Sequence, residues 1–98
     1  MNVLKIANGK LELRKENGVL IRTISTSGVV DGDLNDDLIL VTLSNGKVEL
    51  RKESGVLVRT IVTSNALSAR WNGDDIAIRL TNGKTELRKQ SGVLIRTI

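Results

Sequence analysis

Carboxylates are the main side chains in this 98-residue chain that could perform acid–base chemistry, because the sequence contains no His and no Cys. Two adjacent pairs, Asp36–Asp37 and Asp74–Asp75, could share a proton as the paired carboxylates of some hydrolases do. Both pairs lie in segments that read as turns, where Asp is favoured because its side chain bonds to the nearby backbone. We therefore expect no catalytic residue and no enzymatic activity, and a carboxylate-based hydrolase is the least favoured alternative.

The segment 31–37, Asp-Gly-Asp-Leu-Asn-Asp-Asp, resembles the beginning of a calcium-binding loop. Oxygen-bearing side chains stand at its first, third and fifth positions, where such loops place their ligands. The sixth position should be Gly and is Asp36, and the twelfth should be Glu and is Thr42. A polar strand end followed by a turn explains the segment better, so we expect no bound metal and no cofactor.

Charged residues of both signs are mixed along the chain, which carries a net charge of +4. A Glu-x-Arg sequence recurs three times, as Glu12/Arg14, Glu49/Arg51 and Glu86/Arg88. Opposite charges this close favour cross-strand pairs, or pairs between repeats, over a stripe that binds phosphates. Base stacking needs aromatic faces, and the chain has one Trp with no Phe or Tyr. We therefore expect no nucleic-acid partner.

The Glu-x-Arg sequences belong to a 17-residue unit that occurs at residues 8–24, 45–61 and 82–98, with a step of 37 residues. The middle copy matches each of the others at 14 of 17 positions. Each copy begins with Asn-Gly, which predicts a two-residue hairpin turn of type I′ because both residues tolerate a positive φ. Alternating apolar and charged residues follow, which is the period of a half-buried strand. Repeats this similar are typical of recent duplication or of deliberate construction.

Each full period is predicted to hold four short antiparallel strands. In the last period they are residues 66–71, 76–80, 85–89 and 93–98. No apolar period of 3.6 residues is long enough to indicate a helix. Four strands in 37 residues come close to the ~40–45 residues of a propeller blade. We therefore predict an all-β fold of β-propeller blades with four antiparallel strands each, because a trefoil or a sandwich fits the spacing less well.

The chain resembles the WD-repeat family over nearly its whole length. Residues 71–75, Trp-Asn-Gly-Asp-Asp, stand where such blades turn between their first and second strands. Residues 82–87 look like the Asp-Gly-x-(Val/Ile)-x-Leu hairpin, and residues 91–98 look like the Thr-Gly-x-x-Leu-x-Thr-Leu fourth strand. The family's Gly-His and Trp-Asp pairs are absent, with Arg88-Lys89 in place of the latter. Short, near-identical propeller repeats of unknown function are similar as well, so the resemblance implies blade geometry.

The strand pattern predicts one incomplete blade of three strands at 1–24 and two complete blades at 25–61 and 62–98. The apolar fourth strands, such as 19–21 and 93–95, suggest that the first and last blades lack a polar cap. Head-to-tail contact between copies would cover both outer faces and close a ring. A dimer with six blades is favoured over a trimer with nine.

The segments 25–44 and 62–81 agree at only 6 of 20 positions, so any recognition should reside there. The candidate binding residues at the rim and channel are Asp31, Asp33, Ser68 and Arg70. Asp33 and Arg70 occupy equivalent places in successive blades, which favours an ion pair between them. Arg70 could alternatively hold an anion.

Leu34 and Trp71 also occupy equivalent places in successive blades. We expect both to pack between blades, with Trp71 facing inward in alternation with Leu67 and Ala69. A platform that stacks on a ligand is the less favoured role for Trp71.

We expect a non-catalytic, self-assembling propeller fragment whose closed ring serves as a scaffold. The alternative is a propeller that binds a ligand or a protein, as lectin-like or interaction modules do, through its rim and inner strands. No apolar run approaches the ~20 residues that span a bilayer. Asn2, Lys5 and Asn8 interrupt any apolar region that could serve as a signal peptide. We therefore expect no membrane partner and a cytoplasmic location.

Overall fold

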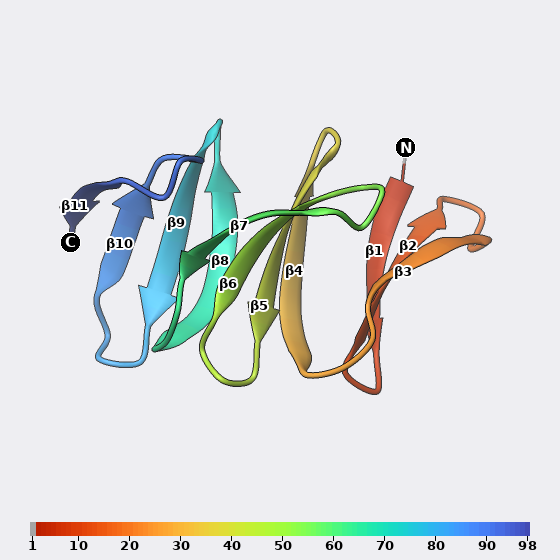
Figure 1. Ribbon diagram of the computed structural model, residues 1–98, viewed down its shortest axis with the longest axis horizontal. Coiled ribbons are helices and arrows are strands. Elements are labelled where there is room, and N and C mark those ends of the chain that lie inside the picture. The colour runs from red at the N-terminus through yellow and green to blue at the C-terminus, as the bar shows by residue number, and fades with distance from the viewer. Residues whose placement is uncertain (1) are drawn as a thin grey trace.

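The computed structural model describes residues 2–98 and shows an all-β architecture of three antiparallel sheets (Figure 1). The strands are β1 (Asn2–Ala7), β2 (Lys10–Lys15), β3 (Leu20–Ser25), β4 (Val29–Asn35), β5 (Leu38–Leu43), β6 (Val48–Lys52), β7 (Leu57–Val62), β8 (Ala66–Asn72), β9 (Asp75–Leu80), β10 (Thr85–Arg88) and β11 (Leu94–Thr97). The first strand was predicted to begin at Met1, which lies outside the described residues. The described part of the chain forms no helix that could cross a bilayer.

The three sheets hold three, four and four strands, and in each sheet consecutive strands are neighbours. We call them the first blade (β1-β2-β3), the second blade (β4-β5-β6-β7) and the third blade (β8-β9-β10-β11). Figure 1 shows the sheets side by side along the longest axis, and β4 contacts both β1 and β8. The predicted β-propeller blades of four antiparallel strands are therefore confirmed in the second and third sheets.

The hairpin between β1 and β2 has the turn that the sequence predicted. Asn8 and Gly9 have φ values of 54° and 76°, as a type I′ turn requires at both central residues. Ala7 and Lys10 pair directly, so the loop has two residues. This is the shortest connection that joins antiparallel strands.

The equivalent hairpins of the other blades differ, and the predicted two-residue turn was wrong for them. At Asn45-Gly46 only Gly46 has a positive φ, of 86°, and the Leu43 amide donates to the Lys47 carbonyl at 2.9 Å across a three-residue loop. The Asn45 side-chain oxygen accepts a bond from the Lys47 amide at 3.0 Å, which holds this longer loop. Gly83 repeats it in the third blade with a φ of 88°.

The shorter first turn changes which side chains of β1 face the second blade. Leu4 pairs with Leu13, and Leu40 pairs with Leu50. Leu13 and Leu50 are one repeat apart, so Leu4 is the structural equivalent of Leu40, although the sequence repeat matches it to Val41. A slip of one residue turns all side chains of a strand to its other face. Leu4 consequently packs against the core between the first two blades.

Two hydrophobic clusters hold the blades together. Cluster one lies between the first and second blades and contains Leu11, Leu13, Ile24, Val29, Ile39 and Val41. Cluster two lies between the second and third blades and contains Leu40, Val48, Leu50, Ile61, Ala66, Ala69, Ile76 and Ile78. Strand β5 supplies both clusters, because alternate side chains of a strand point to opposite faces of its sheet. The fold is therefore held by apolar surface buried between blades.

The first apolar residue of each predicted fourth strand faces solvent in all three blades. Val19, Val56 and Val93 are 54%, 58% and 58% exposed, so this position faces solvent in the middle blade as well. These valines directly precede β3, β7 and β11, the outermost strands of the three blades. The sequence interpretation therefore fails at Val19 and Val93. It holds at Ile95, which is 39% exposed although its equivalents Ile21 and Val58 pack against clusters one and two.

The outward face of the third blade carries polar side chains at some positions. The equivalent positions of the second blade are apolar and pack against the third blade. Asp75 stands where the second blade has Leu38, and Thr85 stands where it has Val48. Ile98 keeps an apolar side chain there but is 69% exposed. This face therefore mixes apolar and polar contact residues.

Candidate binding site at the inner strands

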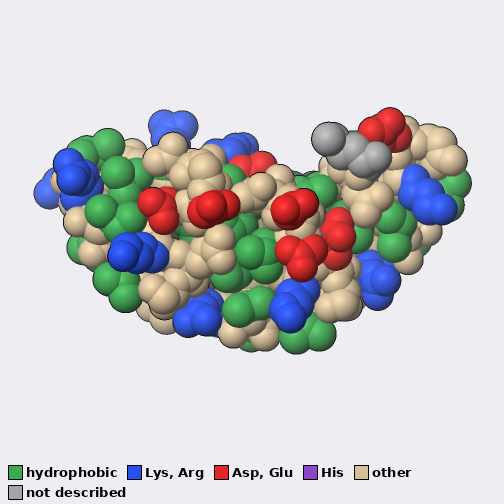
Figure 2. Space-filling view, turned by 90° about the horizontal axis from the view of Figure 1, so that it is seen from above, with side chains coloured by type: hydrophobic (Ala, Val, Ile, Leu, Met, Phe, Trp, Pro, Cys, Tyr) green, Lys and Arg blue, Asp and Glu red, His purple; other side chains and the backbone are tan. Residues whose placement is uncertain are grey.

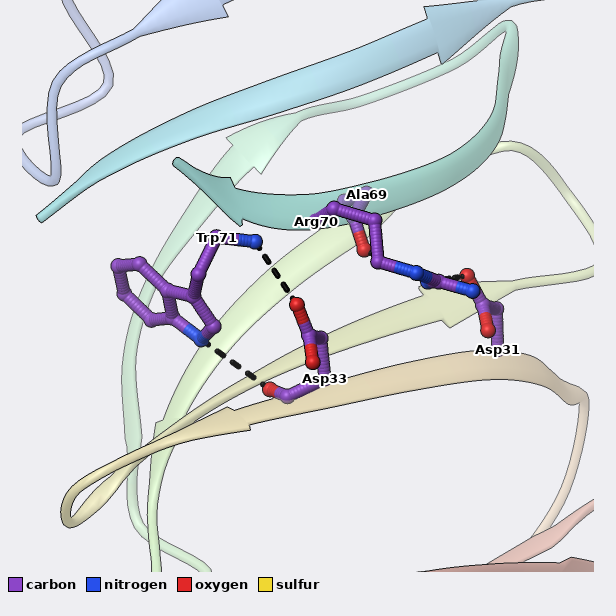
Figure 3. A network of polar contacts seen from close by, with 5 residues as sticks. All are labelled: Asp31, Asp33, Ala69, Arg70 and Trp71. Carbon is purple, nitrogen blue, oxygen red and sulfur yellow. Dashed lines mark hydrogen bonds and ion pairs between the residues drawn. The ribbon is translucent and has the colours of Figure 1, made fainter. Parts of the chain in front are cut away.

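The inner strands β4 and β8 are joined by an ion pair between Asp31 and Arg70 (Figure 3). Nη1 of Arg70 donates to the Asp31 carboxylate and also to the Ala69 carbonyl, at 3.0 Å. The hydrogen bond to Asp31 raises the pKa of Arg70; partial burial opposes this rise, and the charges of Asp31 and Asp33 add to it. Because the Arg70 side chain is 56% exposed, we expect the pair to contribute about 1 kcal/mol or less.

The predicted partner of Arg70 was Asp33, and this was wrong. The Asp33 carboxylate accepts a hydrogen bond from the backbone amide of Trp71 at 2.8 Å, and the Asp33 carbonyl accepts one from the indole Nε1 at 3.2 Å (Figure 3). Neighbouring inner strands are staggered. Each Asp of β4 therefore contacts a residue of β8 that lies one or two positions after its own repeat equivalent. Side chains at equivalent positions therefore do not meet.

Trp71 and Leu34 both lie at contacts between blades. Trp71 is partly buried against cluster two, and Leu34 is partly buried against cluster one. The indole N–H has an acceptor in Asp33, which a partly buried Trp needs. The aromatic ring of Trp71 is thus engaged in packing and hydrogen bonding within the chain.

Ser68 lies in β8 at a bulge, where the pairing with β9 shifts between Ala66 and Ser68. The predicted alternation fails there, because Leu67 is 53% exposed whereas Ala69 and Trp71 face the core. A bulge adds one residue to a strand, so the side chains before the bulge point to the opposite face of the sheet from the one expected. Strand β4 has the same irregularity one repeat earlier. Ser68 is not among the residues of the network in Figure 3.

A groove of about 730 Å³ opens between β1 and β4, beside the turn from β4 to β5. Figure 1 shows where this turn lies in the stack of blades. The groove is lined by residues 2–4, residues 32–36 and Glu53. The Asn2 side chain donates to Glu53 Oε2 at 3.1 Å. The ionisable side chains that line it are Asp33, Asp36 and Glu53. Of these three, sequence reasoning had placed only Asp33 among the candidate binding residues. It had named Asp36 only in a turn, and Glu53 comes from a later part of the chain that shares no local motif with residues 32–36.

The segment that resembled a calcium-binding loop is a strand followed by a turn. Residues 31–35 belong to β4, and Asp36 has a φ of 56° in the tight turn to β5. Asp74 lies in the equivalent turn of the third blade, where its carbonyl accepts a bond from the Gln90 side chain at 3.1 Å. Within residues 2–98, no three His, Cys, Asp or Glu side chains are grouped so that they could hold a metal ion.

Each Glu-x-Arg sequence forms a clip within one blade. Nε of Arg51 donates to Glu49 at 3.1 Å, and its Nη1 donates to the Gly55 carbonyl in the following turn at 2.7 Å. Arg14 and Arg88 repeat both bonds. The predicted cross-strand or inter-repeat pairs were wrong, because residues two apart in a strand share a face and meet each other first. In each blade the Arg side chain thus stabilises the turn that follows its own strand.

No family model matches the chain, and no curated protein sequence matches it either. Among solved structures, its fold is similar to that of Sqt1 from Saccharomyces cerevisiae, a WD40 β-propeller protein. The two superpose with a TM-score of 0.73 at 16% sequence identity. The match covers 92% of this chain and 27% of Sqt1. The chain therefore consists of WD-repeat-like β-propeller blades.

Proposed function

We propose that this chain is a non-catalytic propeller segment whose copies assemble head to tail into a closed scaffold. The outward face of the third blade of one copy would pack on the outward face of the first blade of the next. Inside the chain, both contacts between blades are apolar, so a blade face is built to be covered by another blade. Two copies supply six blades, which lies within the usual range, whereas three copies supply nine.

The observation that carries the proposal is a paired change of side-chain size at the two outward faces. In cluster two, Leu40 of the second blade packs with Ile78 of the third. The equivalents of these two residues at a contact between copies are Ala77 on one copy and Lys5 on the next. Lys5 is longer than Ile78, and Ala77 is smaller than Leu40. At the contact between copies, a longer side chain would thus lie opposite a smaller one. A lysine stem can lie along apolar surface while its ammonium group stays in water.

Apolar residues at the same two faces remain exposed in the single chain. Val3 is 42% exposed, whereas its equivalent Ile39 is fully buried between blades. Ile98 is 69% exposed, whereas its equivalent Ile61 is 6% exposed. Covering each of these side chains would contribute about 1–2 kcal/mol. Head-to-tail contact covers both at once, because they lie on opposite ends of the stack.

Replacing Val3 by Asp tests the proposed contact. A carboxylate there would have to give up its hydration when the contact forms, which is costly even beside Lys5 on the same face of β1, so V3D should lower the mass in solution to that of one copy. Val56→Asp is the matched control, because Val56 is exposed just before β7, the outermost strand of the second blade, and its substitution should leave the mass unchanged. Light scattering behind a sizing column measures both variants. An unmodified chain with the mass of one copy, or an assembly that V3D leaves intact, would contradict the proposal.

A further inference from the structure

Asparagine followed by glycine occurs five times in the chain, at residues 8–9, 17–18, 45–46, 72–73 and 82–83. In such a pair the amide nitrogen of the glycine can attack the asparagine side chain, because glycine has no Cβ to obstruct the approach. The asparagine then loses ammonia and becomes aspartate or isoaspartate. We propose that Asn72 is the preferred site of this spontaneous deamidation, and that its isoaspartate product loosens the contact between the second and third blades.

Each bond of the reaction can be followed at Asn72. The Gly73 nitrogen loses its proton to a base in solution, attacks Cγ of Asn72 and closes a succinimide ring. The Cγ–Nδ2 bond breaks, and Nδ2 takes up a proton and leaves as ammonia. Water then opens the ring, at Cγ to give aspartate or at the backbone carbonyl to give isoaspartate, whose main chain gains one methylene group. The reaction consumes water and releases ammonia, without oxidation or reduction.

Three of the five pairs are held by two hydrogen bonds each. The Gly46 amide donates to the Leu43 carbonyl at 2.9 Å. The Lys47 amide donates to Oδ1 of Asn45 at 3.0 Å. The same two bonds recur at Asn17 and Asn82. Ring closure removes the proton that the glycine donates and turns the asparagine side chain away, so the loss of either bond should slow the reaction about fivefold.

The pair at Asn72 has neither of these bonds. Among residues 2–98, the Gly73 amide donates no hydrogen bond and the Asn72 side chain makes none. Asn72 ends β8, the turn to β9 follows it, and both residues of the pair are exposed. Of the described atoms outside its chain neighbours, none would lie within 4 Å of a Cβ added at Gly73. The Gly73 nitrogen and Cγ of Asn72 are therefore free to approach each other.

The pair at Asn8 likewise has neither bond within the part of the chain that the structure describes, but its glycine is packed. The Gly9 carbonyl accepts a bond from the Val29 amide at 3.0 Å. A Cβ added at Gly9 would lie 3.2 Å from the Gly28 nitrogen. Movement of Gly9 toward the Asn8 side chain would disturb this contact between the first and second blades, so Asn8 should react more slowly than Asn72.

Isoaspartate at position 72 would alter a link between blades. Nδ2 of Asn35 donates to the Gly73 carbonyl at 3.2 Å, which joins the end of β4 to the turn after β8. The added methylene group moves Gly73 relative to β8 and would break this bond. It would also lie next to Trp71, whose amide donates to Asp33 of β4. The second and third blades would therefore be held together less firmly at this end.

The product also carries a new negative charge. Figure 2 views the molecule from the end where the turns β4–β5 and β8–β9 lie, and acidic side chains gather across the middle of this end. Asp74 and Asp75 directly follow Gly73 in the sequence. Because repulsion between exposed charges is weak, the added carboxylate should change stability little by itself. It does allow ion-exchange chromatography to separate the deamidated chains.

Peptide mapping of the incubated chain tests the preference for Asn72. The folded full chain is kept at mildly alkaline pH, and trypsin then places each Asn-Gly pair in a separate peptide, because Lys or Arg separates all five. Tandem mass spectrometry measures the change from amide to acid at each site. Asn72 should react at least about fivefold faster than Asn17, Asn45 or Asn82. A rate at Asn72 that does not exceed the rates at the other four pairs would overturn the proposal.

The same chain unfolded in urea is the control, because it keeps every local sequence and loses the hydrogen bonds. Circular dichroism confirms that the first sample stays folded and the second unfolded. In urea the five pairs should react at similar rates, since each glycine amide is equally accessible. A preference for Asn72 that persists in urea would assign it to the local sequence and contradict protection by the fold.

The variant N72D separates the new charge from the longer main chain. It carries the carboxylate without the added methylene group, so its unfolding in urea should match that of the unmodified chain. The isoaspartate form, isolated by ion exchange, should have an unfolding equilibrium constant about fivefold higher, because the bond from Asn35 is lost. Equal constants for N72D and the isoaspartate form would overturn the loosening of the blades. Neither measurement requires contact between copies, so both remain decisive for a chain that stays single.

Discussion

The backbone amide of Trp71 donates a hydrogen bond of 2.8 Å to the Asp33 carboxylate, so a side chain of β4 is fixed to the main chain of β8. The indole of the same Trp returns a bond to the Asp33 carbonyl at 3.2 Å. Both bonds lie in partly buried surroundings. Hydrogen bonds to an ionised acceptor are stronger than neutral ones, so this pair of residues is the main polar link between the second and third blades.

Asp33→Ala should lower the free energy of unfolding by about 2 kcal/mol, because the partly buried Trp71 amide would lose its acceptor. Asp31→Ala is the control, because it removes the more exposed pair with Arg70 and should cost about 0.5 kcal/mol or less. Urea unfolding followed by Trp71 fluorescence measures both. An equal or larger loss in the Asp31 variant would show that the exposed ion pair holds the inner strands together.

Thr42→Val should stabilise the chain by about 1 kcal/mol. Thr42 is 1% exposed, and among residues 2–98 its Oγ1 is a buried side-chain oxygen without a hydrogen-bond partner. Valine has nearly the same shape and removes the cost of burying that hydroxyl. Thr60→Val is the control, because Thr60 is exposed and should change stability little. The midpoints of thermal unfolding of the unmodified chain, T42V and T60V test this prediction. A lower midpoint for T42V would mean that the hydroxyl does have a partner.

Leu4→Ala should cost about 2 kcal/mol of unfolding free energy, because the one-residue-shorter turn at Asn8-Gly9 points Leu4 into the core beside cluster one. Leu57→Ala makes the same chemical change on an outermost strand, where Leu57 is 45% exposed. It should cost about 0.5 kcal/mol or less. Urea unfolding of both variants tests the register of β1. Similar losses would mean that Leu4 faces outward, as the sequence repeat alone would place it.

Most strands could be predicted from the sequence because they are short, many alternate apolar and polar residues, and several end at Asn-Gly or a single Gly. These are local signals, and the strand pairing that follows from tight turns is local too. The equivalence of Leu34 and Trp71 at the contacts between blades was predictable for the same reason. Residues 37 positions apart occupy the same place in successive blades, so their surroundings repeat together with the sequence.

The side-chain partners could not be predicted from the sequence. They depend on shifts of one or two residues between neighbouring strands, and the repeat of 37 residues gives no sign of these shifts. The stagger between β4 and β8 moves the partner of Arg70 from Asp33 to Asp31. Bulges in both strands reverse the residues before them, and one residue fewer in the first turn reverses β1. A shift of one residue alters no composition or period, so sequence reasoning that relies on equivalence between repeats misses it.

The most direct test of head-to-tail assembly is a native mass spectrum of the unmodified chain, recorded over a range of concentrations around tens of micromolar. The account predicts a closed species of two copies, twice the 10.7 kDa of one chain, with no open series of growing oligomers. A trimer would keep the head-to-tail contact and change only the number of blades in the ring. A single copy at every concentration would contradict the account, because it would mean that the polar residues on the outer faces end the stack.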